Sequence, residues 1–480
     1  MSKNVVVAGA GLGGIAAALR LACARHAVQV WEPGAVPGGK LRERREHGYR
    51  WDLGPSLLTM PHVLEELFAA AGERLEDHLA LERLPGACRY FWRDGTVIDE
   101  DERFWARPEV ARYLRRAKGI YDLSGEAYLS RPPAQFARAL ASPRGLPRLR
   151  HLPKVAARRT LAELSRKSFR DIHLRQLFDR FATYNGSSPY RTPATFSIIP
   201  YVEARFGAWY VRGGMAEIAR ALARLAEARG VRFCHGVAAA RWGRGVLTGS
   251  DGRTARPDVL VCNQDVLAAA QTWLDGHFSA REMAALRRPE LSSSAFVLTF
   301  GLPRRYSQLR HHNLFFSDDY RAEFDDLFIR RRLPEDPSLY VALTARTDPG
   351  DAPEGCDNYF VLANAPALPP GSLSPEDAAA YADRILARLE SSGLPALRRM
   401  AVGLKIQAPE DFAARDGSLH GALYGWASHS LRAALLRPPL WSARRPGLYF
   451  VGGTTHPGGG IPLVLRGAGM VAARIAEEKR

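Results

Sequence analysis

The sequence has few cysteines and no pattern of them that would bind a metal or build a disulfide framework. Only five occur in 480 residues, and none stands in a Cys-x-x-Cys pair. Such spacing favours a reducing compartment and argues against a structural zinc site. We therefore expect no metal. The cysteines are Cys23, Cys88, Cys234, Cys262 and Cys356.

Long apolar runs are also missing. No segment reaches the roughly 18 uncharged apolar residues of a membrane span. The stretch 5–19 comes closest, but it contains four glycines and no convincing signal-peptide cleavage site follows it. A hydrophobic content of 46% with 24% charged residues is typical of a folded globular protein. The length favours two domains or more, and we expect a cytoplasmic protein.

Glycine is concentrated first in "VVVAGAGLGG", where an apolar, strand-like run ends in Gly9-x-Gly11-x-x-Gly14. A helical pattern and a second strand, "AVQVWE", follow and end in Glu32. In this order Gly9 permits a tight turn, Gly11 lets the backbone approach a pyrophosphate, and Gly14 allows helix and strand to pack closely. The helix amino terminus favours the phosphates, and Glu32 is placed to bind ribose hydroxyls. The pattern predicts a dinucleotide site.

A second glycine pair indicates which dinucleotide binds. Gly38 and Gly39, followed by Lys40, come directly after the ribose acid, and "DLGPS" (52–56) follows. Plain NAD dehydrogenases have no need of this element. FAD is longer and needs more backbone contact along its pyrophosphate and ribityl chain. We therefore predict non-covalent FAD.

The third concentration is "VGGTTHPGGGIPLVLRGAG" (451–469), with five glycines at positions 452–460. A short strand precedes this loop, and a helix is expected to start near Pro462, because proline suits a first helical turn. A flat ring system lying against the main chain would exclude side chains there. We expect Gly453 and Gly460 to make room for the flavin and for the substrate against it.

These segments resemble the phytoene desaturase family of FAD-dependent carotenoid desaturases, and the resemblance extends over nearly the whole chain. The stretch 451–468 is similar to the family's C-terminal pattern, and 292–302, 311–320 and 347–366 also resemble the family. Within it, residues 54–79 and 311–328 look closest to the hydroxycarotenoid 3,4-desaturase branch. The resemblance implies removal of a hydride and a proton from a CH2–CH2 of an acyclic carotenoid, with quinone or O2 as electron acceptor. The implied cofactor contacts are Gly9, Gly11, Gly14, Glu32, Gly38, Gly39, Lys40, Gly54, Pro55, Ser56, Val237, Gly452, Gly453, Gly460, Ile461 and Pro462.

The implied fold class is α/β, a Rossmann-like FAD-binding domain of the amine oxidase/carotenoid desaturase type with an inserted α+β substrate domain. Strand and helix patterns near 216–263 return to the nucleotide domain, which makes that domain discontinuous. We expect it to comprise 1–75, 205–265 and 440–480. Residues 76–204 and 266–439 would form the substrate-binding and membrane-associating domain.

Two residues are candidates for proton handling. His456 lies in the flavin loop, although a structural hydrogen bond that shapes the loop is the competing interpretation. Asp348 lies in "TDPGDAPEG", a family-like segment, but Asp-Pro is more often a turn. No Ser-His-Asp or Cys-His arrangement is visible, as suits a very apolar substrate held in a tunnel.

The segment 137–178 is strongly basic, with eleven Lys or Arg against Glu163 and Asp171. Its cations and apolar residues suit an anionic membrane surface, and a solvated helical face is the alternative. We expect peripheral association with the inner face of the membrane. Because no nucleic-acid module is recognised, we expect no nucleic-acid partner.

Other functions share these motifs. Related carotene isomerases use FAD without net redox chemistry and keep nearly all of the glycines. A phytoene desaturase or a soluble amine oxidase is also compatible with the motifs, and the substrate stays open at this level.

Overall fold

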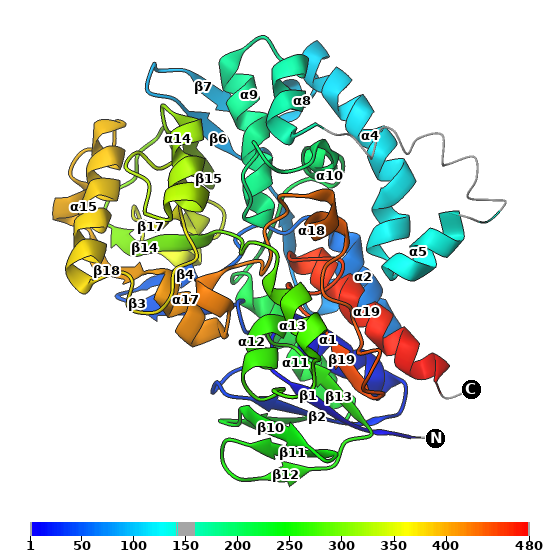
Figure 1. Ribbon diagram of the computed structural model, residues 1–480. Coiled ribbons are helices and arrows are strands. Elements are labelled where there is room, and N and C mark those ends of the chain that lie inside the picture. The colour runs from blue at the N-terminus through cyan, green and yellow to red at the C-terminus, as the bar shows by residue number, and fades with distance from the viewer. Residues whose placement is uncertain (1, 141, 143–158, 479–480) are drawn as a thin grey trace.

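The structure is a computed structural model that describes residues 2–140, 142 and 159–478. A five-stranded parallel sheet forms the core of the lower half of the molecule in Figure 1. Its strand order is β19-β13-β1-β2-β9, so strands from both ends of the chain lie in one sheet. The strands are β1 (Asn4–Ala8), β2 (Ala27–Glu32), β9 (Arg232–His235), β13 (Val259–Cys262) and β19 (Leu448–Phe450).

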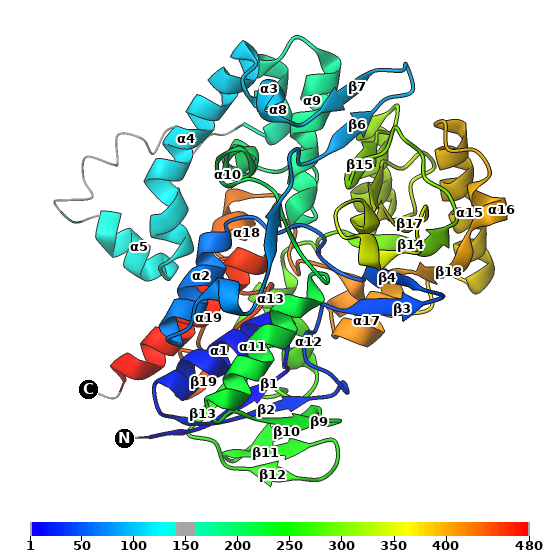
Figure 2. The same cartoon turned by 180° about the vertical axis from the view of Figure 1, so that it is seen from behind.

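The two faces of this sheet are covered differently, because successive side chains of a strand point to opposite sides. Val5 and Val7 pack in the cluster formed with four helices, which Figure 2 shows above the sheet. Val6 and Ala8 pack on the other side, with a three-stranded antiparallel sheet and a short helix. The four helices are α1 (Leu12–Cys23), α2 (Pro61–Ala70), α11 (Ala216–Ala228) and α19 (Ile461–Glu477); opposite them lie β10 (Ala239–Gly243), β11 (Val246–Gly249), β12 (Thr254–Ala255) and α12 (Val266–Gln271), which α13 (Ala280–Arg287) follows.

A seven-stranded mixed sheet forms the second unit, in the order β18-β14-β17-β16-β15-β6-β7. Alternation again divides its side chains between two clusters. Phe315 and Val341 pack toward α15, whereas Leu314 and Tyr90 pack toward the helices at the top of Figure 1. The strands are β6 (Arg89–Phe91), β7 (Val97–Asp99), β14 (Ser294–Leu302), β15 (His312–Phe315), β16 (Leu339–Ala342), β17 (Asp357–Ala365) and β18 (Val402–Gln407).

Helices surround this second sheet. Thr160 starts one of them with a capping box, because its side chain accepts the Glu163 N–H while Glu163 bonds back to the Thr160 N–H. The helices are α3 (Glu102–Trp105), α4 (Pro108–Leu129), α5 (Pro133–Leu140), α8 (Leu161–Ser168), α9 (Ile172–Asp179), α10 (Ile198–Phe206), α14 (Tyr320–Asp325), α15 (Pro375–Ser391), α16 (Leu397–Met400), α17 (Pro409–Asp416) and α18 (Leu431–Leu435), with the 3-10 turn η2 (Arg180–Asn185) after α9.

A hairpin and a second two-stranded sheet, formed by segments distant in sequence, connect the units. The strands β3 (Glu43–Glu46) and β4 (Tyr49–Asp52) pair with each other, and the Trp51 side chain of β4 donates to the Phe300 carbonyl of the seven-stranded sheet. The strand β5 (Leu81–Arg83) pairs with β8 (Trp209–Val211). The domain limits at 75 and 205 fall beside these contacts and stay a prediction.

None of the described helices is both long and apolar enough to cross a lipid bilayer. Among the same residues, no group of three or more His, Cys, Asp or Glu side chains is arranged to hold a metal ion.

Candidate functional site

The first glycine loop joins β1 to α1 at the carboxyl end of the parallel sheet. Gly9 has a φ of +105°, which L side chains rarely adopt. A Cβ on Gly14 would lie 2.1 Å from the Gly9 carbonyl oxygen, so only glycine lets the helix approach this closely. No side chain caps the helix at Gly11. The first N–H groups of α1 are therefore available to an anionic ligand.

Glu32 ends β2 beside this loop and is only 4% exposed. Its Oε2 accepts the Ala10 N–H at 2.7 Å, and its Oε1 accepts the Gly34 N–H at 2.8 Å. The Glu32 carbonyl oxygen accepts the N–H of buried Val237 at 3.0 Å. The carboxylate is thus held in place by the backbone, and each oxygen keeps a lone pair for a further donor such as a ribose hydroxyl.

The second glycine pair packs directly on the first loop. The Gly38 N–H donates to the Ala10 carbonyl at 2.8 Å. A Cβ on Gly39 would lie 2.9 Å from the Cα of Gly11. The two loops therefore approach at backbone distance, and a side chain at either position would separate them.

Lys40 and the segment 54–56 lie beside these two loops. Together they form one wall of the candidate cofactor site. A Cβ on Gly54 would lie 1.9 Å from the Lys40 carbonyl oxygen. The Lys40 ammonium donates to the Leu423 carbonyl at 2.6 Å, and burial lowers its pKa. Pro55 is exposed, and the Ser56 hydroxyl lies 2.6 Å from the Tyr340 hydroxyl of β16. Ser56 therefore connects this wall to the seven-stranded sheet.

The third glycine loop returns between β19 and α19 to the same place. A Cβ on Gly13 would lie 3.1 Å from the Gly452 nitrogen, so the last loop touches the first turn of α1. The Asn263 side chain fills the space between them. Its Nδ2 donates to the Gly9 carbonyl at 3.2 Å, and its Oδ1 lies 3.2 Å from the position of a Gly452 Cβ.

Asn263 is a site residue that the sequence analysis did not single out. It directly follows β13, which lies between β1 and β19. Ligands of parallel α/β sheets bind beyond the carboxyl ends of the strands. The position of Asn263 at the end of a third buried strand was the signal that could have identified it.

The glycines of the last loop differ in their surroundings. A Cβ on Gly453 would lie 3.4 Å from the Gly459 Cα, whereas nothing lies within 4 Å of a Cβ on Gly460. Gly460 is exposed, has a φ of +110° and precedes α19, whose amino terminus no side chain caps. Ile461 is buried as the first residue of the helix, and Pro462 follows it. Open backbone and an uncapped helix thus meet at Gly460.

This arrangement fits the FAD predicted from the sequence. Three glycine loops expose their main chain at this site. Side chains at these glycines would occupy the space in front of it. Two uncapped helix amino termini face it with partial positive charge. An oriented, buried carboxylate stands at one end, at Glu32. The main-chain surface matches a flat ring system, the helix amino termini match a pyrophosphate, and the carboxylate matches a ribose.

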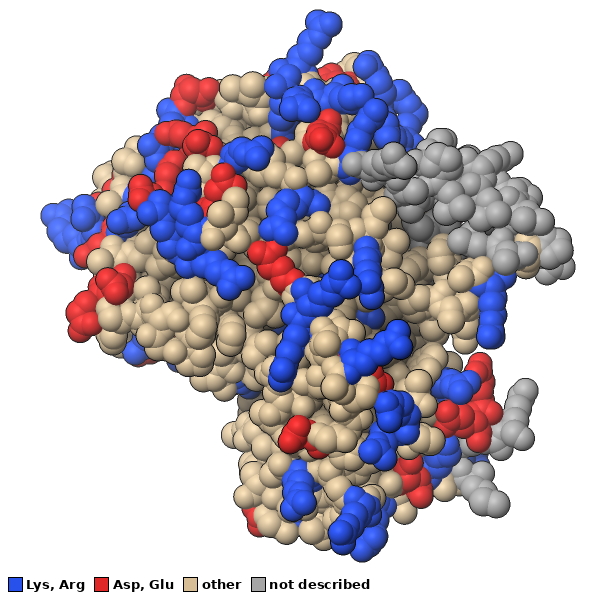
Figure 3. Space-filling view, in the orientation of Figure 1, with Lys and Arg blue, Asp and Glu red and all other residues tan. Residues whose placement is uncertain are grey.

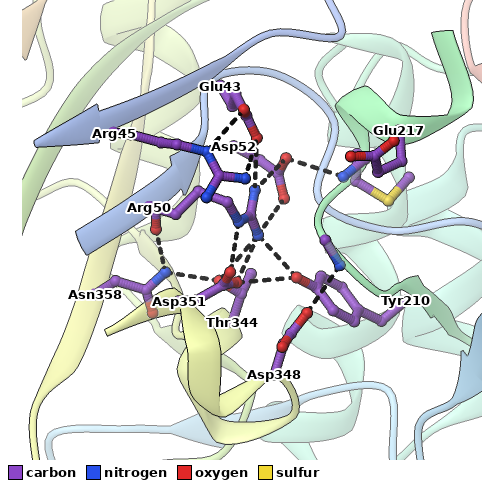
Figure 4. Close-up of polar contacts among 12 residues, drawn as sticks. Glu43, Arg45, Arg50, Asp52, Tyr210, Glu217, Thr344, Asp348, Asp351 and Asn358 are labelled. Atoms are coloured by element: carbon purple, nitrogen blue, oxygen red, sulfur yellow. Dashed lines mark hydrogen bonds and ion pairs between the residues drawn. The ribbon is translucent and has the colours of Figure 1, made fainter. Parts of the chain in front are cut away.

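Asp348 takes part in a polar network between the two units (Figure 4). Its Oδ2 accepts the Gly213 N–H at 2.8 Å. Beside it, the buried Arg50 guanidinium binds Asp351 through Nε and Nη2, each at 2.5 Å, and Asp52 through Nη1 at 3.0 Å. Through its bond to Gly213, Asp348 holds the loop after β8. A catalytic role for Asp348 stays a prediction.

His456 is 1% exposed, and its Nε2 lies 2.8 Å from the Arg131 carbonyl oxygen. Since a carbonyl only accepts, Nε2 carries the proton and Nδ1 is the basic nitrogen. Nδ1 is buried and has no hydrogen-bond partner among the described residues. Burial lowers the pKa of His456. The hydrogen bond to Arg131 fits the loop-shaping interpretation, while the free Nδ1 leaves a proton-accepting role as a prediction.

Part of the basic segment 137–178 lies outside the described residues, at 141 and 143–158. Figure 3 shows Lys and Arg gathered at the top of the molecule, over α4, α8 and α9. Exposed cations there include Arg112, Arg115, Arg116, Arg166, Lys167 and Arg170.

Comparison with known proteins identifies full-length relatives. The model of the family described as flavin containing amine oxidoreductase matches residues 12–476. The chain is 34% identical to a 4,4'-diapolycopene oxygenase of Methylomonas sp, over 99% of both chains. It is 34% identical to a 1-hydroxycarotenoid 3,4-desaturase of Flavobacterium sp. (strain P99-3), over 98% of both. A zeta-carotene-forming phytoene desaturase of Myxococcus xanthus is 35% identical, over 98% of this chain and 94% of the relative.

Among solved structures, cyclohexylamine oxidase from Brevibacterium oxydans IH-35A superposes with a TM-score of 0.62 over all of both chains, at 17% identity. This likeness confirms the predicted fold class.

Proposed function

Because this chain belongs to the flavin-containing amine oxidoreductases, in their carotenoid desaturase branch, and is an FAD-dependent oxidoreductase, we propose that it desaturates an acyclic carotenoid. The observation that carries this proposal is the 34–35% identity, over nearly the whole chain, to three enzymes named for carotenoid substrates. The amine oxidase neighbour shares the fold at only 17% identity.

Bound FAD supplies a hydride acceptor for this reaction. We assign its ribose to Glu32, its pyrophosphate to the amino terminus of α1, and its ring to the backbone around Gly453 and Gly460. The complete set of residues proposed to line the cofactor is Gly9, Gly11, Gly14, Glu32, Gly38, Gly39, Lys40, Gly54, Pro55, Ser56, Val237, Gly452, Gly453, Gly460, Ile461 and Pro462. We propose Asn263 in addition, because its side chain bonds the Gly9 carbonyl.

Desaturation also releases a proton. Of the two candidates, His456 has the free nitrogen, because Nδ1 lacks a partner among the described residues. Asp348 already uses one carboxylate oxygen on Gly213. We therefore favour His456 over Asp348 as the group that handles this proton.

At the finer level we propose 3,4-desaturation of a 1-hydroxycarotenoid, for which the resemblance of 54–79 and 311–328 to that branch is the support. The identities of 34% and 35% to the hydroxycarotenoid and phytoene enzymes do not separate the two. Phytoene desaturation is therefore the second candidate, and cis–trans isomerisation without net redox change is the third.

We further propose that the enzyme takes its substrate from a membrane surface and passes electrons to quinone or O2. The exposed cations over α4, α8 and α9 support attraction to anionic lipid.

The test is expression in hosts that accumulate phytoene or a 1-hydroxycarotenoid, followed by absorption spectra of the extracted pigments. A red shift in the hydroxycarotenoid host alone supports the finer proposal. A red shift from phytoene supports the second candidate. Altered isomer composition with an unchanged number of conjugated bonds supports the third, and unchanged pigment in both hosts contradicts a carotenoid substrate.

A further inference from the structure

Two buried arginines of this protein differ in how their guanidinium groups are satisfied. Arg50, which is 2% exposed, donates from Nε, Nη1 and Nη2 to carboxylates and hydroxyls. Arg180, which is 7% exposed, makes one hydrogen bond to the described residues, from Nη2 to the Tyr90 hydroxyl at 2.7 Å. Its Nε is buried without a partner there. A buried donor left unpaired costs free energy unless something else binds it.

Aromatic rings enclose Arg180. Its guanidinium carbon lies 5.2 Å from the ring centre of Tyr90, 4.9 Å from that of Phe181 and 5.2 Å from that of Tyr184. Such rings attract the cation but do not use its N–H donors. The guanidinium is therefore surrounded by aromatic rings, and its Nε donor stays unused among the described residues.

Two carboxyl groups stand beside this arginine. Glu100 accepts from the Tyr90 hydroxyl, and Glu203 accepts from the Tyr184 hydroxyl at 2.7 Å. Burial, followed by the neighbouring Glu203, raises the pKa of Glu100 well above its ordinary value. One oxygen of each carboxyl, Oε1, has no other partner among the described residues. Glu100 therefore stands in a buried site that disfavours a further negative charge.

The charge of the cluster limits what it can bind. Arg180 is the cation of the cluster, and two carboxyl groups, Glu100 and Glu203, already stand beside it. The Arg180 to Glu100 distance is 4.0 Å, so the charges are close but not in direct contact. A carboxylate ligand would leave an uncompensated buried charge, which is costly. A neutral hydroxyl or carbonyl oxygen would accept from Arg180 at no cost in net charge.

Tyr90, which bonds Arg180, is aligned across the seven-stranded sheet with Tyr340, which bonds the wall of the cofactor site. Leu314 pairs with Tyr340 on one side and with Tyr90 on the other, so Tyr340 and Tyr90 point to the same face, two strands apart. Neighbouring strands are about 4.8 Å apart, which separates the two tyrosines by about 10 Å. Tyr340 is the residue that bonds Ser56.

We infer that Arg180, with Glu100, Glu203 and Tyr184, forms a subsite for a neutral oxygen-bearing end group of the lipophilic substrate. This inference rests on the proposed carotenoid function. An apolar polyene makes no use of these buried polar groups. A hydroxyl, in contrast, can accept from Arg180 and donate to the carboxyl pair.

The experiment uses the FAD-loaded full chain and two acyclic carotenoids of equal skeleton and conjugation, one with a terminal hydroxyl and one without. For each, kcat/KM in lipid vesicles and Kd from tryptophan quenching are measured for wild type, Arg180→Met, Tyr184→Phe and Tyr113→Phe. We expect wild type to prefer the hydroxylated carotenoid. Arg180→Met should reduce this preference about 10- to 100-fold, the usual loss for a hydrogen bond to a charged group. Tyr184→Phe should reduce it less.

Tyr113→Phe is the control, because Tyr113 is a buried tyrosine of the same helical layer that makes no hydrogen bond to the cluster carboxyls among the described residues. It should leave the preference unchanged. A wild-type enzyme without preference, or an FAD-loaded Arg180→Met enzyme that keeps it, overturns the inference. If Arg180→Met does not fold, an unchanged preference in Tyr184→Phe overturns it. If wild type binds both carotenoids but converts neither, the proposed desaturation fails, and the ratio of Kd values still decides the subsite.

Discussion

Asp351 holds the buried Arg50 guanidinium with both carboxylate oxygens, at 2.5 Å each, across 301 positions of sequence. The bond joins the β3–β4 hairpin, beside the cofactor loops, to the segment between β16 and β17. Tyr210 of β8 also donates to Asp351, at 2.9 Å. The contact therefore ties the glycine-rich unit to the seven-stranded sheet.

Removing one partner of this pair should be strongly destabilising. Asp351→Ala leaves the Arg50 cation buried without its main acceptor, and we expect a loss of about 3–5 kcal/mol in the free energy of unfolding. Urea denaturation followed by tryptophan fluorescence measures it. The exposed pair Arg74 and Glu76 is the control, and Glu76→Ala should leave stability nearly unchanged, because solvent screens an exposed ion pair. Equal effects of the two substitutions would contradict a structural role for Asp351.

Acid should destabilise the protein through His311. This side chain is 7% exposed, and burial lowers its pKa to about 4. Asp351 and Arg50 are the charged groups that face it, acting in opposite directions. In the unfolded chain His311 binds a proton near pH 6.5, before the folded protein does. The free energy of unfolding should therefore fall as pH drops from about 6.5 toward 4, by about 2 kcal/mol between pH 7 and 5.

His311→Gln should flatten this part of the stability profile, measured by urea midpoints at several pH values. The exposed His47 provides the control, since His47→Gln should leave the slope as it is. A slope that His311→Gln does not change would assign the acid sensitivity to other groups.

The local part of the site could be predicted from the sequence. Strand, glycines, helix, strand and acid follow one another within residues 4–32, so neighbouring residues define the geometry at Gly9, Gly14 and Glu32. The predicted FAD cofactor and amine oxidase fold are confirmed by the family match and by the solved neighbour. The assignment of individual residues to the cofactor stays a prediction.

The remaining features depend on contacts between distant segments. Asn263 enters the glycine loops because β13 lies beside β1, 254 positions away. Arg180 meets Tyr90 across 90 positions, and Glu203 comes from a third element, α10. No local periodicity encodes which buried polar side chains will meet. For the same reason the roles of Asp348 and Asp351, three residues apart, could not be distinguished before their partners were known.

Glu32 should govern retention of FAD. Glu32→Ala removes the oriented acceptor assigned to the ribose, and we expect the Kd for FAD to rise about 10- to 100-fold. Flavin absorbance of the purified protein and titration of the apoprotein measure this. Glu32 also accepts the Ala10 and Gly34 N–H groups, so Tm should fall as well. Glu43→Ala, at a part-buried acid in β3, is the control for lost stability. Full FAD retention in Glu32→Ala would remove Glu32 from the site.

Membrane association should depend on charge at α8. Arg166 and Lys167 are exposed, and their replacement by Glu should weaken binding to anionic vesicles without unfolding the protein. Binding should also weaken as salt rises, because exposed charges are screened over about 8–10 Å at physiological ionic strength. Charge reversal at Arg241 and Arg244, on the small sheet at the opposite end of Figure 1, is the control. Equal binding to neutral and anionic vesicles would exclude electrostatic attraction.

A substitution at Gly460 distinguishes a loop that contacts the cofactor from a loop that only turns the chain. Its φ is +110° and nothing in the chain lies within 4 Å of a Cβ there, so a side chain meets only backbone strain or a bound ligand. Gly245, in the turn between β10 and β11, offers the matched control, with a φ of +75° and equally open space. Valine at either position should lower stability by about 1 kcal/mol or more through its restricted backbone.

If the flavin and the substrate lie against Gly460, only Gly460→Val should also lose FAD or turnover. Melting temperature, flavin content and product are measured on one preparation of each variant. A folded Gly460→Val protein with full flavin content and normal product would place the ring elsewhere.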